Sequence, residues 1–532
     1  MTYAGDLVYT WHGELQGYDT SSDSGRIGLY INGSWTAFKR HHIDSDYNAV
    51  LKLGEGSDIP INPGCYDMSF DLATGVLKVA NGNEQLDANR ITVFGSSVAN
   101  GQGAEQVENV NHGYIYLYGE QLAQRNAGDK SPNPFYISNI SINGNSTINL
   151  LNRYDDMRRE FGKYVMFGVS LGNEGIHDSA DKQAVYDQFR NNMQSLISMV
   201  RADGKIPVVC NNYTRGDFTA EDYRYILDMD REIGLWDVPS INLLGAIDSK
   251  NGKWADGYQN GTDIYHPNQQ GHQEFAYAVV PSMFDALESG KELCMDRLTA
   301  SGLEMGNITV KAIPEDIMHS FSFVIVLDGV PVEGNIANVK LEGNDAGIKI
   351  SSFDGNIVAA IGDTSAKVPC AIAKGRVMIA VSYTYASGIL DLSVYNGNQS
   401  LGESRLDNLE IVPVEFVVGP ADLNLYEALL YRSALSASDV ESLANGELQK
   451  SSLEIYSLFE PESCKSQTVE NHAMSLNGFN VDRATDTSVT EIDNTLVPAV
   501  YYGVNGIATD TPEKGRIYIV TANGKADKVR LK

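Results

Sequence analysis

The stretch that most constrains the fold runs from residue 91 to residue 103, Ile-Thr-Val-Phe-Gly-Ser-Ser-Val-Ala-Asn-Gly-Gln-Gly. An apolar, β-branched run stops there in small and turn-forming residues, which predicts a buried strand followed by a loop. Such junctions hold ligand and catalytic groups in α/β proteins, because a rigid strand aims a loop that need not be buried. Ser97 is the candidate in this loop. Glycine-rich loops more often turn the chain or cradle a phosphate, so catalysis needs support from other motifs.

Strand and helix patterns alternate from residue 91 to about residue 290. Five short apolar runs are predicted to be buried strands, at 91–94, 136–142, 164–169, 206–210 and 240–244. Apolar residues at helical spacing predict helices over 150–161 and 185–200, and Thr219 with Asp222 predicts a capped start for a third helix. This alternation predicts a parallel sheet covered by helices on both faces.

The segments on either side of this region have the two-residue period of β-strands. Strands at 26–30 and 34–38 flank Asn32-Gly33, which favours a type I′ hairpin, and 66–70 with 76–79 form a second pair. Beyond residue 300 the pattern continues at 390–395, with one capped short helix at 436–443. We therefore predict a β-rich module at 1–90, an α/β domain at 91–295, a β-sandwich at 300–460 and a small β segment at 461–532.

The charge of the chain argues against several kinds of partner. Its 532 residues carry a formal net charge of −29, whereas DNA, RNA and anionic membranes are bound through an excess of Lys and Arg. No apolar run is long enough to span a membrane. Five widely spaced cysteines predict neither a disulfide framework nor a CxxC metal site. The first residues lack a basic-then-apolar leader, as expected of a cytosolic chain or of a mature form without its signal peptide.

A serine hydrolase needs a nucleophile, a base, a group that fixes the tautomer of the base, and donors for the oxyanion. Asp263 and His266 lie three residues apart just before a predicted helix. On a tight turn, the carboxylate can hold one ring nitrogen of His266 while the other faces Ser97. The pair also fits a helix-start hydrogen bond and a surface histidine. A zinc site is a weaker alternative, because His266 and His272 are six apart rather than the four that put two ligands on one helix face.

Two further loops follow strands of the same predicted sheet. Gly144 lies in the loop after the second strand, and Asn173 lies in the loop after the third. A glycine lets its backbone N–H approach a reacting oxygen, and an asparagine side chain offers an NH₂ donor that cannot lose its proton. Each loop alone is most simply a turn. Four strand-end signals in the order Ser, Gly, Asn, Asp-x-x-His are much harder to produce by accident.

Together these motifs resemble the SGNH, or GDSL-type, hydrolase family. Residues 94–101, Phe-Gly-Ser-Ser-Val-Ala-Asn-Gly, are similar to the family's Phe-Gly-Asp-Ser block, and residues 172–174, Gly-Asn-Glu, are similar to its Gly-x-Asn-Asp block. The Asp-x-x-His motif and the glycine of the second loop also match. The chain departs from the pattern at Ser96, where the family has Asp, and at Glu174. Neither position carries the nucleophile, the base or an oxyanion donor.

The resemblance implies a fold, a reaction and a set of roles. The fold is a three-layer α/β domain with a flavodoxin-like parallel sheet, joined here to all-β accessory domains. Ser97 would attack an ester carbonyl, His266 would accept and return its proton, and Asp263 would orient the imidazole. The backbone N–H groups of Ser97 and Gly144 and the side chain of Asn173 would hold the oxyanion. No metal or organic cofactor is implied.

Two β segments carry further resemblances. Residues 431–446, Tyr-Arg-Ser-Ala-Leu-Ser-Ala-Ser-Asp-Val-Glu-Ser-Leu-Ala-Asn-Gly, resemble a segment of laminin-G-like, concanavalin-type jelly rolls. Residues 502–506 and 515–520 resemble the small β tails of secreted Bacteroidota proteins, which implies a secreted, periplasmic or cell-surface protein. The whole chain thus resembles secreted Bacteroidota carbohydrate esterases.

The flanking modules also suggest a substrate. We expect an acetyl or other small acyl group on a polysaccharide, because the modules resemble carbohydrate-associated ones and a module that holds polymer raises the local substrate concentration. Trp236 and Trp254 are candidates for aromatic side chains near Ser97, although Trp236 fits a core position equally well. The alternatives are a lipid or aryl esterase, which needs a broad apolar cleft, and a non-catalytic glycan-binding surface protein on an inactive scaffold.

Overall fold

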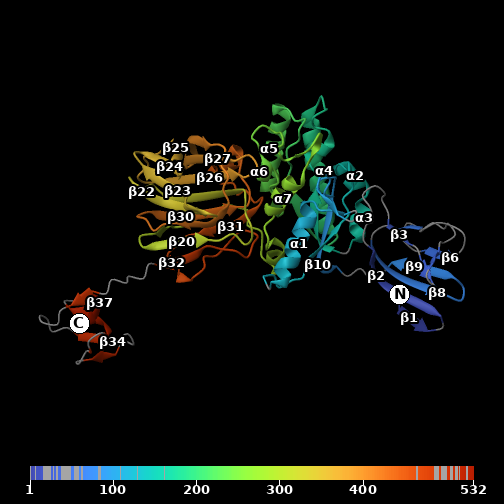
Figure 1. Ribbon diagram of the computed structural model, residues 1–532, viewed down its shortest axis with the longest axis horizontal. Helices are drawn as coiled ribbons and strands as arrows, with labels where there is room; N and C mark the ends of the chain where they lie inside the picture. Colours follow the sequence, from blue (N-terminus) through green and yellow to red (C-terminus); the bar gives the residue numbers. More distant parts are fainter. Residues whose placement is uncertain are drawn as a thin grey trace.

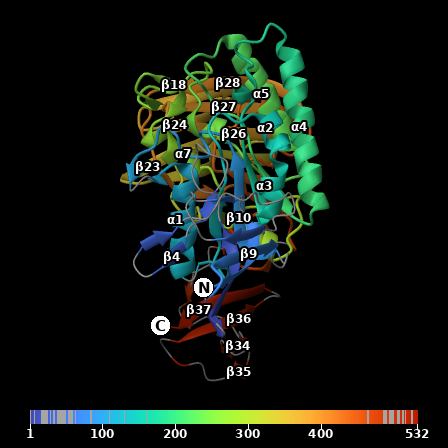
Figure 2. The ribbon, with the colours of Figure 1, turned by 90° about the vertical axis from the view of Figure 1, so that its right-hand side faces the viewer.

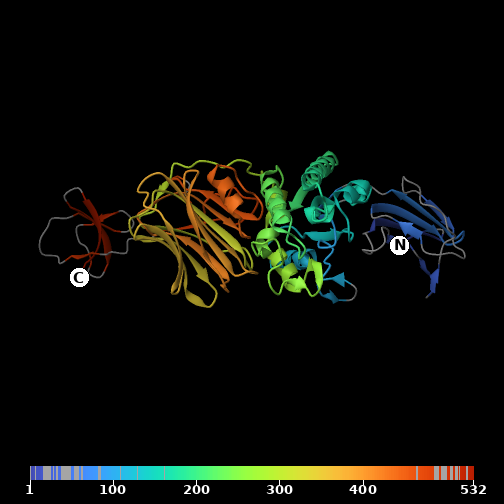
Figure 3. The ribbon, with the colours of Figure 1, turned by 90° about the horizontal axis from the view of Figure 1, so that it is seen from above.

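The structure is a computed structural model of the chain. It describes residues 86–107, 110–128, 130–160, 162–462 and 465–483, together with 2–5, 7–15, 25–27, 29–31, 34–36, 49–52, 59–61 and 64–81 before them and 490–492, 500–503, 507–509, 513, 516–522 and 525–531 after them. Four parts lie in a row (Figures 1 and 3): a β-sheet with the N-terminus, an α/β part, a β-sandwich and a small sheet with the C-terminus.

The α/β part is built on a five-stranded parallel sheet. Its order is β13-β10-β14-β15-β16, and every neighbouring pair is parallel. In chain order this is 2-1-3-4-5, the flavodoxin-like arrangement. The strands are β10 (Asp87–Gly95), β13 (Tyr136–Asn139), β14 (Gly162–Gly168), β15 (Ile206–Cys210) and β16 (Ser240–Ile241). The prediction of a parallel sheet is confirmed.

Helices cover both faces of this sheet, as predicted (Figure 2). Successive residues of a strand point to opposite faces, so Tyr164 and Met166 of β14 pack into one core while Val165 and Phe167 pack into another. The first core is closed by α1 (Tyr114–Ala127), α7 (Gln269–Tyr277) and α8 (Met283–Glu288). The second is closed by α2 (Thr147–Asn152), α3 (Tyr154–Arg159), α4 (Lys182–Ala202) and α5 (Ala220–Leu235).

Several predicted elements differ from those observed. The strand predicted over 136–142 ends at Asn139. The helix predicted over 150–161 is divided into α2 and α3 at Arg153, whose guanidinium turns inward to the carbonyl of Ile140 at 2.8 Å. Residue 161 lies outside the described residues. The strand predicted over 240–244 ends at Ile241, and α6 (Leu244–Ile247) follows. There the Asn242 side chain accepts the backbone N–H of Gly245 at 2.8 Å, a local hydrogen bond that competes with the sheet.

The β-sandwich consists of two antiparallel sheets whose inner faces share one apolar core. One sheet has the order β19-β30-β21-β26-β27-β28, with β31 pairing β30, and the other has the order β25-β24-β23-β22-β29-β20-β32. Phe323 and Phe416 meet in the core between the sheets, with ring centroids 5.3 Å apart. The predicted capped helix is confirmed as α9 (Ala437–Ala444), in which Ser436 and Asp439 form a capping box.

The strands of the first sheet are β19 (Leu303–Glu304), β21 (Phe321–Asp328), β26 (Arg376–Thr384), β27 (Ile389–Asn396), β28 (Gln399–Leu406), β30 (Asn424–Tyr431) and β31 (Leu453–Leu458). Those of the second are β20 (Ile308–Ala312), β22 (Gly334–Leu341), β23 (Asn344–Phe353), β24 (Asn356–Ile361), β25 (Thr364–Pro369), β29 (Pro413–Val418) and β32 (Asn480–Arg483). The strand predicted at 390–395 is confirmed within β27, which pairs with β28 across the turn at Gly397.

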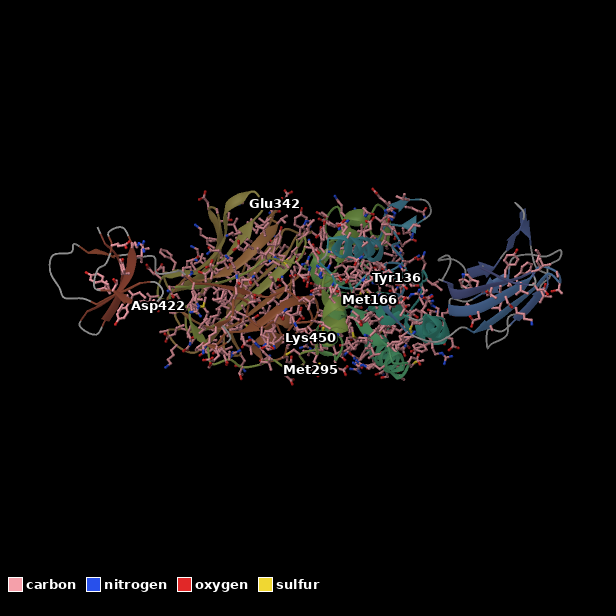
Figure 4. The ribbon with its side chains drawn as sticks, turned by 90° about the horizontal axis from the view of Figure 1, so that it is seen from below. Tyr136, Met166, Met295, Glu342, Asp422 and Lys450 are labelled. Carbon is pink, nitrogen blue, oxygen red and sulfur yellow. The ribbon has the colours of Figure 1, made fainter. Side chains whose placement is uncertain are left out.

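The β-sandwich and the α/β part share a buried, hydrogen-bonded interface. The guanidinium of Arg432 is fully buried, pairs with Glu454 at 2.7 Å and donates its Nε–H to the carbonyl of Tyr277 at 2.8 Å. Further backbone hydrogen bonds join Ser452 to Ser240, Ala434 to Gly245, and Lys450, labelled in Figure 4, to Gly234. A buried cation needs such a complete set of partners, so the two parts depend on each other at this surface.

A separate β-sheet lies at each end of the chain. The N-terminal one has the order β1-β2-β8-β9-β6, and the predicted pairing of 66–70 with 76–79 is confirmed by β8 and β9. The predicted hairpin of 26–30 with 34–38 is confirmed in part, because β4 (Leu29–Ile31) pairs with β5 (Ser34–Thr36) whereas β3 (Gly25–Ile27) pairs with β7. Asn32-Gly33 lies outside the described residues. Other strands are β1 (Thr2–Gly5), β2 (Val8–Leu15), β3 (Gly25–Ile27), β6 (Ala49–Lys52), β7 (Ile59–Ile61), β8 (Gly64–Asp71) and β9 (Val76–Asn81).

The C-terminal sheet has the order β33-β37-β36-β34-β35. Its strands are β33 (Thr490–Ile492), β34 (Val500–Gly503), β35 (Ala508–Thr509), β36 (Ile517–Ala522) and β37 (Lys525–Leu531). Residues 504–506 and 515, which belong to the tail motifs of the sequence, lie outside the described residues. Among the described residues, no helix combines the length and the apolar character needed to cross a membrane.

Candidate active site

Ser97 lies in the turn that follows β10. Hydrogen bonds of 2.9 Å from Asn100 N to Ser96 O and from Gln102 N to Ser97 O wind this loop tightly. Gly95 permits the turn, since a Cβ there would lie 2.4 Å from the carbonyl oxygen of Gly168 in β14. The close approach of the two strands fixes the point at which the loop leaves the sheet. Ser97 therefore sits at the carboxyl end of β10, with 8% of its surface exposed.

Ser97, His266 and Asp263 form one hydrogen-bonded chain. The Nε2 atom of His266 lies 2.8 Å from the Oγ of Ser97, and its Nδ1 lies 2.7 Å from the Oδ2 of Asp263. The structure thus brings together three residues that the sequence separates by up to 169 positions. An imidazole between a serine hydroxyl and a carboxylate is placed to take the hydroxyl proton and to have its own positive charge stabilised.

The local structure around Asp263 differs from the predicted tight turn. Asp263 and His266 lie on β18 (Asp263–Pro267), which pairs with β17 (Gln259–Asn260) ahead of α7. The Oδ1 of Asp263 accepts the backbone N–H of Tyr265 at 3.0 Å, an Asx-type bond that curls the chain at this point. Gly103 lets the Ser97 loop approach β18, because a Cβ there would lie 2.1 Å from the carbonyl oxygen of Pro267.

Ser97 and Gly144 are the residues whose backbone N–H groups the sequence suggests as oxyanion donors. In the part of the chain that the structure describes, neither the N–H of Ser97 nor that of Gly144 donates a hydrogen bond. Gly144 lies in a turn closed by Asn145 N and Ile142 O at 3.2 Å, and its φ of +77° favours glycine. β11 (Gln106–Val107) and β12 (Val110–Asn111) form a short hairpin beyond the Ser97 loop.

Asn173 lies in a single 3₁₀ turn, η1 (Leu171–Glu174), directly after β14. Its Oδ1 accepts the backbone N–H of Ser170 and the hydroxyl of Ser96, both at 3.1 Å. Because a backbone N–H can only donate, this contact fixes which end of the amide is oxygen and leaves Nδ2 as the donor end. Glu174 accepts the backbone N–H of Thr147 at 2.5 Å. The two residues that depart from the SGNH pattern, Ser96 and Glu174, therefore hold the site loops in place.

His272 is a structural residue whose two ring nitrogens both have backbone partners. Its Nδ1 accepts the backbone N–H of Tyr114 at 3.2 Å, and its Nε2 donates to the carbonyl of Gln102 at 3.0 Å. Both partners are backbone groups, which fixes the tautomer and occupies both nitrogens. Burial lowers the pKa of His272 to about 4, so the ring is neutral. No cluster of three His, Cys, Asp or Glu side chains suited to a metal is found among the described residues.

We expect acid to destabilise the fold through His272. Its pKa of about 4 in the folded chain is below the usual 6.5, so between these values the unfolded chain binds the additional proton. The free energy of unfolding therefore falls as the pH drops, by about 2 kcal/mol between pH 7 and pH 5. Thermal denaturation at both pH values should show a smaller loss of stability for His272→Gln than for the wild type. Equal losses would contradict this role.

The sequence of this region matches a known family. Residues 93–274 match the profile of the GDSL-like Lipase/Acylhydrolase family. The chain contains a GDSL-type acylhydrolase domain. Ser97, Gly144, Asn173, Asp263 and His266 all lie within the matched residues of this GDSL domain.

Among curated proteins, none matches the chain. Similar solved structures include a catalytic mutant of Axe2, an acetylxylan esterase from Geobacillus stearothermophilus, at 14% identity and TM-score 0.30, covering 37% of this chain and 94% of that one. TesA is 17% identical at TM-score 0.29, covering 36% and 97%. A provisionally assigned acylhydrolase from Bacteroides fragilis NCTC 9343 is 12% identical at TM-score 0.29, covering 38% and 91%.

The tryptophans that we considered for this site are core residues of the GDSL domain. Trp236 is 9% exposed, and Trp254 is 6% exposed and donates its Nε1–H to the carbonyl of Ile264 at 2.9 Å. An exposed aromatic side chain does lie next to the triad residues: it is Tyr265, between Asp263 and His266 in the sequence. Sequence reasoning missed it, although its position inside the Asp-x-x-His motif placed it next to the base.

Proposed function

We propose that the GDSL domain is a serine esterase that removes acetyl or other small acyl groups from a polysaccharide. The observation that carries this proposal is the hydrogen-bonded chain from Ser97 through His266 to Asp263. Three groups in this order supply a nucleophile, a general base and a carboxylate that stabilises the imidazolium. The family match supports ester hydrolysis as the class of reaction.

The reaction proceeds in two halves through an acyl-enzyme. The Oγ of Ser97 attacks the ester carbonyl while the Nε2 of His266 takes the hydroxyl proton. The tetrahedral intermediate collapses when His266 gives this proton to the leaving alcohol oxygen, and the acyl group stays on Ser97. Water then enters, loses a proton to His266 and attacks the acyl carbonyl. Return of the proton to Ser97 releases the carboxylic acid and restores the site.

The negative oxygen that forms in each half needs hydrogen-bond donors. The backbone N–H groups of Ser97 and Gly144 and the Nδ2 of Asn173 take this role in the proposal. Support comes from the two N–H groups without protein acceptors in the described residues and from the fixed orientation of the Asn173 amide. Preorganised donors are effective because they need not reorient when charge develops.

The side chains around the Ser97 loop support a sugar substrate. The Nδ2 of Asn100 donates to Asn143 at 2.9 Å, and the Nδ2 of Asn143 donates to Gln102 at 3.1 Å. Amides both donate and accept, as sugar hydroxyls do, whereas a lipid chain needs apolar surface. Laminin-G-like and tail resemblances of the flanking β parts add support for a polymer substrate and for action outside the cytoplasm. The polymer substrate and the location outside the cytoplasm are both parts of the proposal.

Replacing Asn173 by alanine tests the oxyanion role. We expect kcat to fall by roughly 10² to 10³ with little change in KM, since the donor acts on charge that develops only in the transition state. Steady-state kinetics with para-nitrophenyl acetate measure this. Asn335→Ala, which changes an exposed asparagine of β22, is the matched control and should behave as wild type. An Asn173→Ala variant that is as active as the control would remove Asn173 from the site.

The function itself is tested by acetate release from acetylated xylan and pectin, with wild type and Ser97→Ala side by side. Release by the wild type that disappears in the variant supports both the nucleophile and the substrate class. Labelling with a fluorophosphonate should follow the same pattern, because it reports an activated serine. Hydrolysis of lipid or aryl esters without any release from polymer would favour that alternative. Equal background rates and no labelling would favour a non-catalytic glycan-binding protein.

A further inference from the structure

Tyr265 is a half-exposed aromatic ring beside the proposed base. Its surface is 50% exposed, whereas most large side chains of the GDSL domain are buried. The ring centroid lies 6.5 Å from that of His266, and the two ring planes meet at 74°. The backbone N–H of Tyr265 is bonded to the carboxylate that also holds the imidazole. Tyr265 and His266 are therefore positioned by the same side chain, that of Asp263.

Arg215 holds this ring from one side. Its guanidinium carbon lies 4.6 Å from the centroid of the Tyr265 ring, a cation–π contact. The guanidinium itself is fixed, because Nε and Nη2 donate to the carboxylate of Asp217 at 3.1 and 2.6 Å and Nη1 donates to the carbonyl of Gly172 at 2.6 Å. One face of the ring is thus covered by a paired cation. The exposed half of Tyr265 is left to solvent or to a ligand.

The chemistry at His266 determines which part of a substrate would meet this ring. In ester hydrolysis His266 must give its proton to the leaving alcohol oxygen, so the alcohol part of the ester has to lie next to the imidazole. The acyl carbonyl oxygen lies instead among the donors at Ser97, Gly144 and Asn173. Tyr265 is consequently on the alcohol side of the ester.

We propose that Tyr265 is the platform on which the sugar unit that carries the ester packs during hydrolysis. This inference rests on the proposed function and narrows it to the alcohol side of the substrate. A sugar ring presents an apolar C–H face that can pack flat on an aromatic ring, while its hydroxyls remain at the edge for polar partners. The charge of Arg215 is paired with Asp217, and the Ser97 loop carries the neutral amides of Asn100 and Gln102. The site therefore suits an uncharged sugar.

The test compares two acetyl esters that differ only in their alcohol part. Ethyl acetate has an alcohol too small to reach Tyr265, whereas an acetylated xylo-oligosaccharide brings a sugar ring. We expect Tyr265→Ala to lower the ratio of kcat/KM for the oligosaccharide to kcat/KM for ethyl acetate by about tenfold, mainly through KM. Tyr265→Phe keeps the ring and should keep the ratio. Phe353→Ala, at a 60% exposed ring on β23, is the matched control.

Four results would contradict the proposed sugar platform at Tyr265. If Tyr265→Ala lowers both kcat/KM values equally, the ring only supports His266, and if the ratio is unchanged, the sugar does not contact it. In either case the wild type still hydrolyses both esters, so the proposed function stands. If the wild type hydrolyses neither ester, the proposed function fails and the platform fails with it. If the ratio falls equally in Phe353→Ala, the sugar contacts the β-sandwich instead of Tyr265, which also contradicts the inference.

Discussion

His266→Ala is expected to lower kcat on an acetyl ester by about 10⁶-fold, close to the rate without a triad. His266 is the one base that the described residues place within hydrogen-bond distance of Ser97, whose Oγ lies 2.8 Å from its Nε2, so the variant has no group to take the hydroxyl proton. The Ser97 hydroxyl is then too weak a nucleophile to attack an ester at neutral pH. KM should change little, because His266 acts on the proton rather than on the bound ester. Rapid-mixing assays for the wild type and long incubations for the variant, both with para-nitrophenyl acetate, cover the range of rates.

His177 provides a matched control for this variant. It also pairs with a carboxylate, since its Nδ1 lies 2.8 Å from the Oδ2 of Asp222. Asp222 also receives the ammonium of Lys182 at 2.6 Å, which marks the cluster as an ion-pair network that caps α5. His177→Ala should leave kcat within a few-fold of wild type, a size typical of changes away from the reacting atoms. Comparable losses in both variants would show that histidine replacement acts through the fold rather than through proton transfer.

Asp263→Asn is expected to lower kcat by about 10⁴-fold while leaving the geometry of the site intact. The reason lies in how the two carboxylate oxygens are used. Oδ1 accepts the backbone N–H of Tyr265, which an asparagine oxygen can also do, so the NH₂ group is forced to face Nδ1 of His266. The amide then donates to Nδ1, and the imidazole carries its proton on Nε2. In that tautomer His266 cannot accept the proton of Ser97.

The pH dependence of Asp263→Asn distinguishes this explanation from misfolding. If His266 is held in the wrong tautomer, hydroxide can act as the base in its place. The residual kcat should therefore rise with pH through the alkaline range. Circular dichroism and the melting temperature should match those of the wild type. Asp256→Asn, at an exposed carboxylate of the same domain, is a suitable control and should retain full activity. Wild-type rates in Asp263→Asn would exclude the carboxylate from the mechanism.

Much of the GDSL domain could be predicted because its signals are local. The buried strands are short apolar runs, and the parallel sheet follows from their alternation with helical patterns. Ser97, Gly144 and Asn173 follow three of these strands, and parallel strands end at the same edge of a sheet. The meeting of Ser97 with Asp263 and His266 was a hypothesis that depended on the recognised order of motifs. The structure brings His266 within hydrogen-bond distance of both Ser97 and Asp263.

Other features depend on contacts that local patterns do not encode. His272 was considered only as a metal ligand, because its two backbone partners, at Gln102 and Tyr114, are more than 150 residues away. The cation–π contact of Arg215 with Tyr265 joins residues 50 apart in the chain and leaves no periodic signal. The break at Arg153 follows from where its guanidinium finds acceptors, although Tyr154 and Met157 keep the predicted apolar spacing. Long-range hydrogen bonds thus decided the details that spacing could not.

The contacts of Arg432 affect how this protein can evolve. A sandwich moved to another enzyme by gene fusion would carry a buried guanidinium whose acceptor, the carbonyl of Tyr277, belongs to the partner left behind. The same transfer would leave the carbonyl of Ser240 without its donor, because this carbonyl accepts a hydrogen bond from the backbone N–H of Ser452. Each lost partner leaves a buried polar group unsatisfied. Selection should therefore pass on the GDSL domain and the sandwich as one heritable unit.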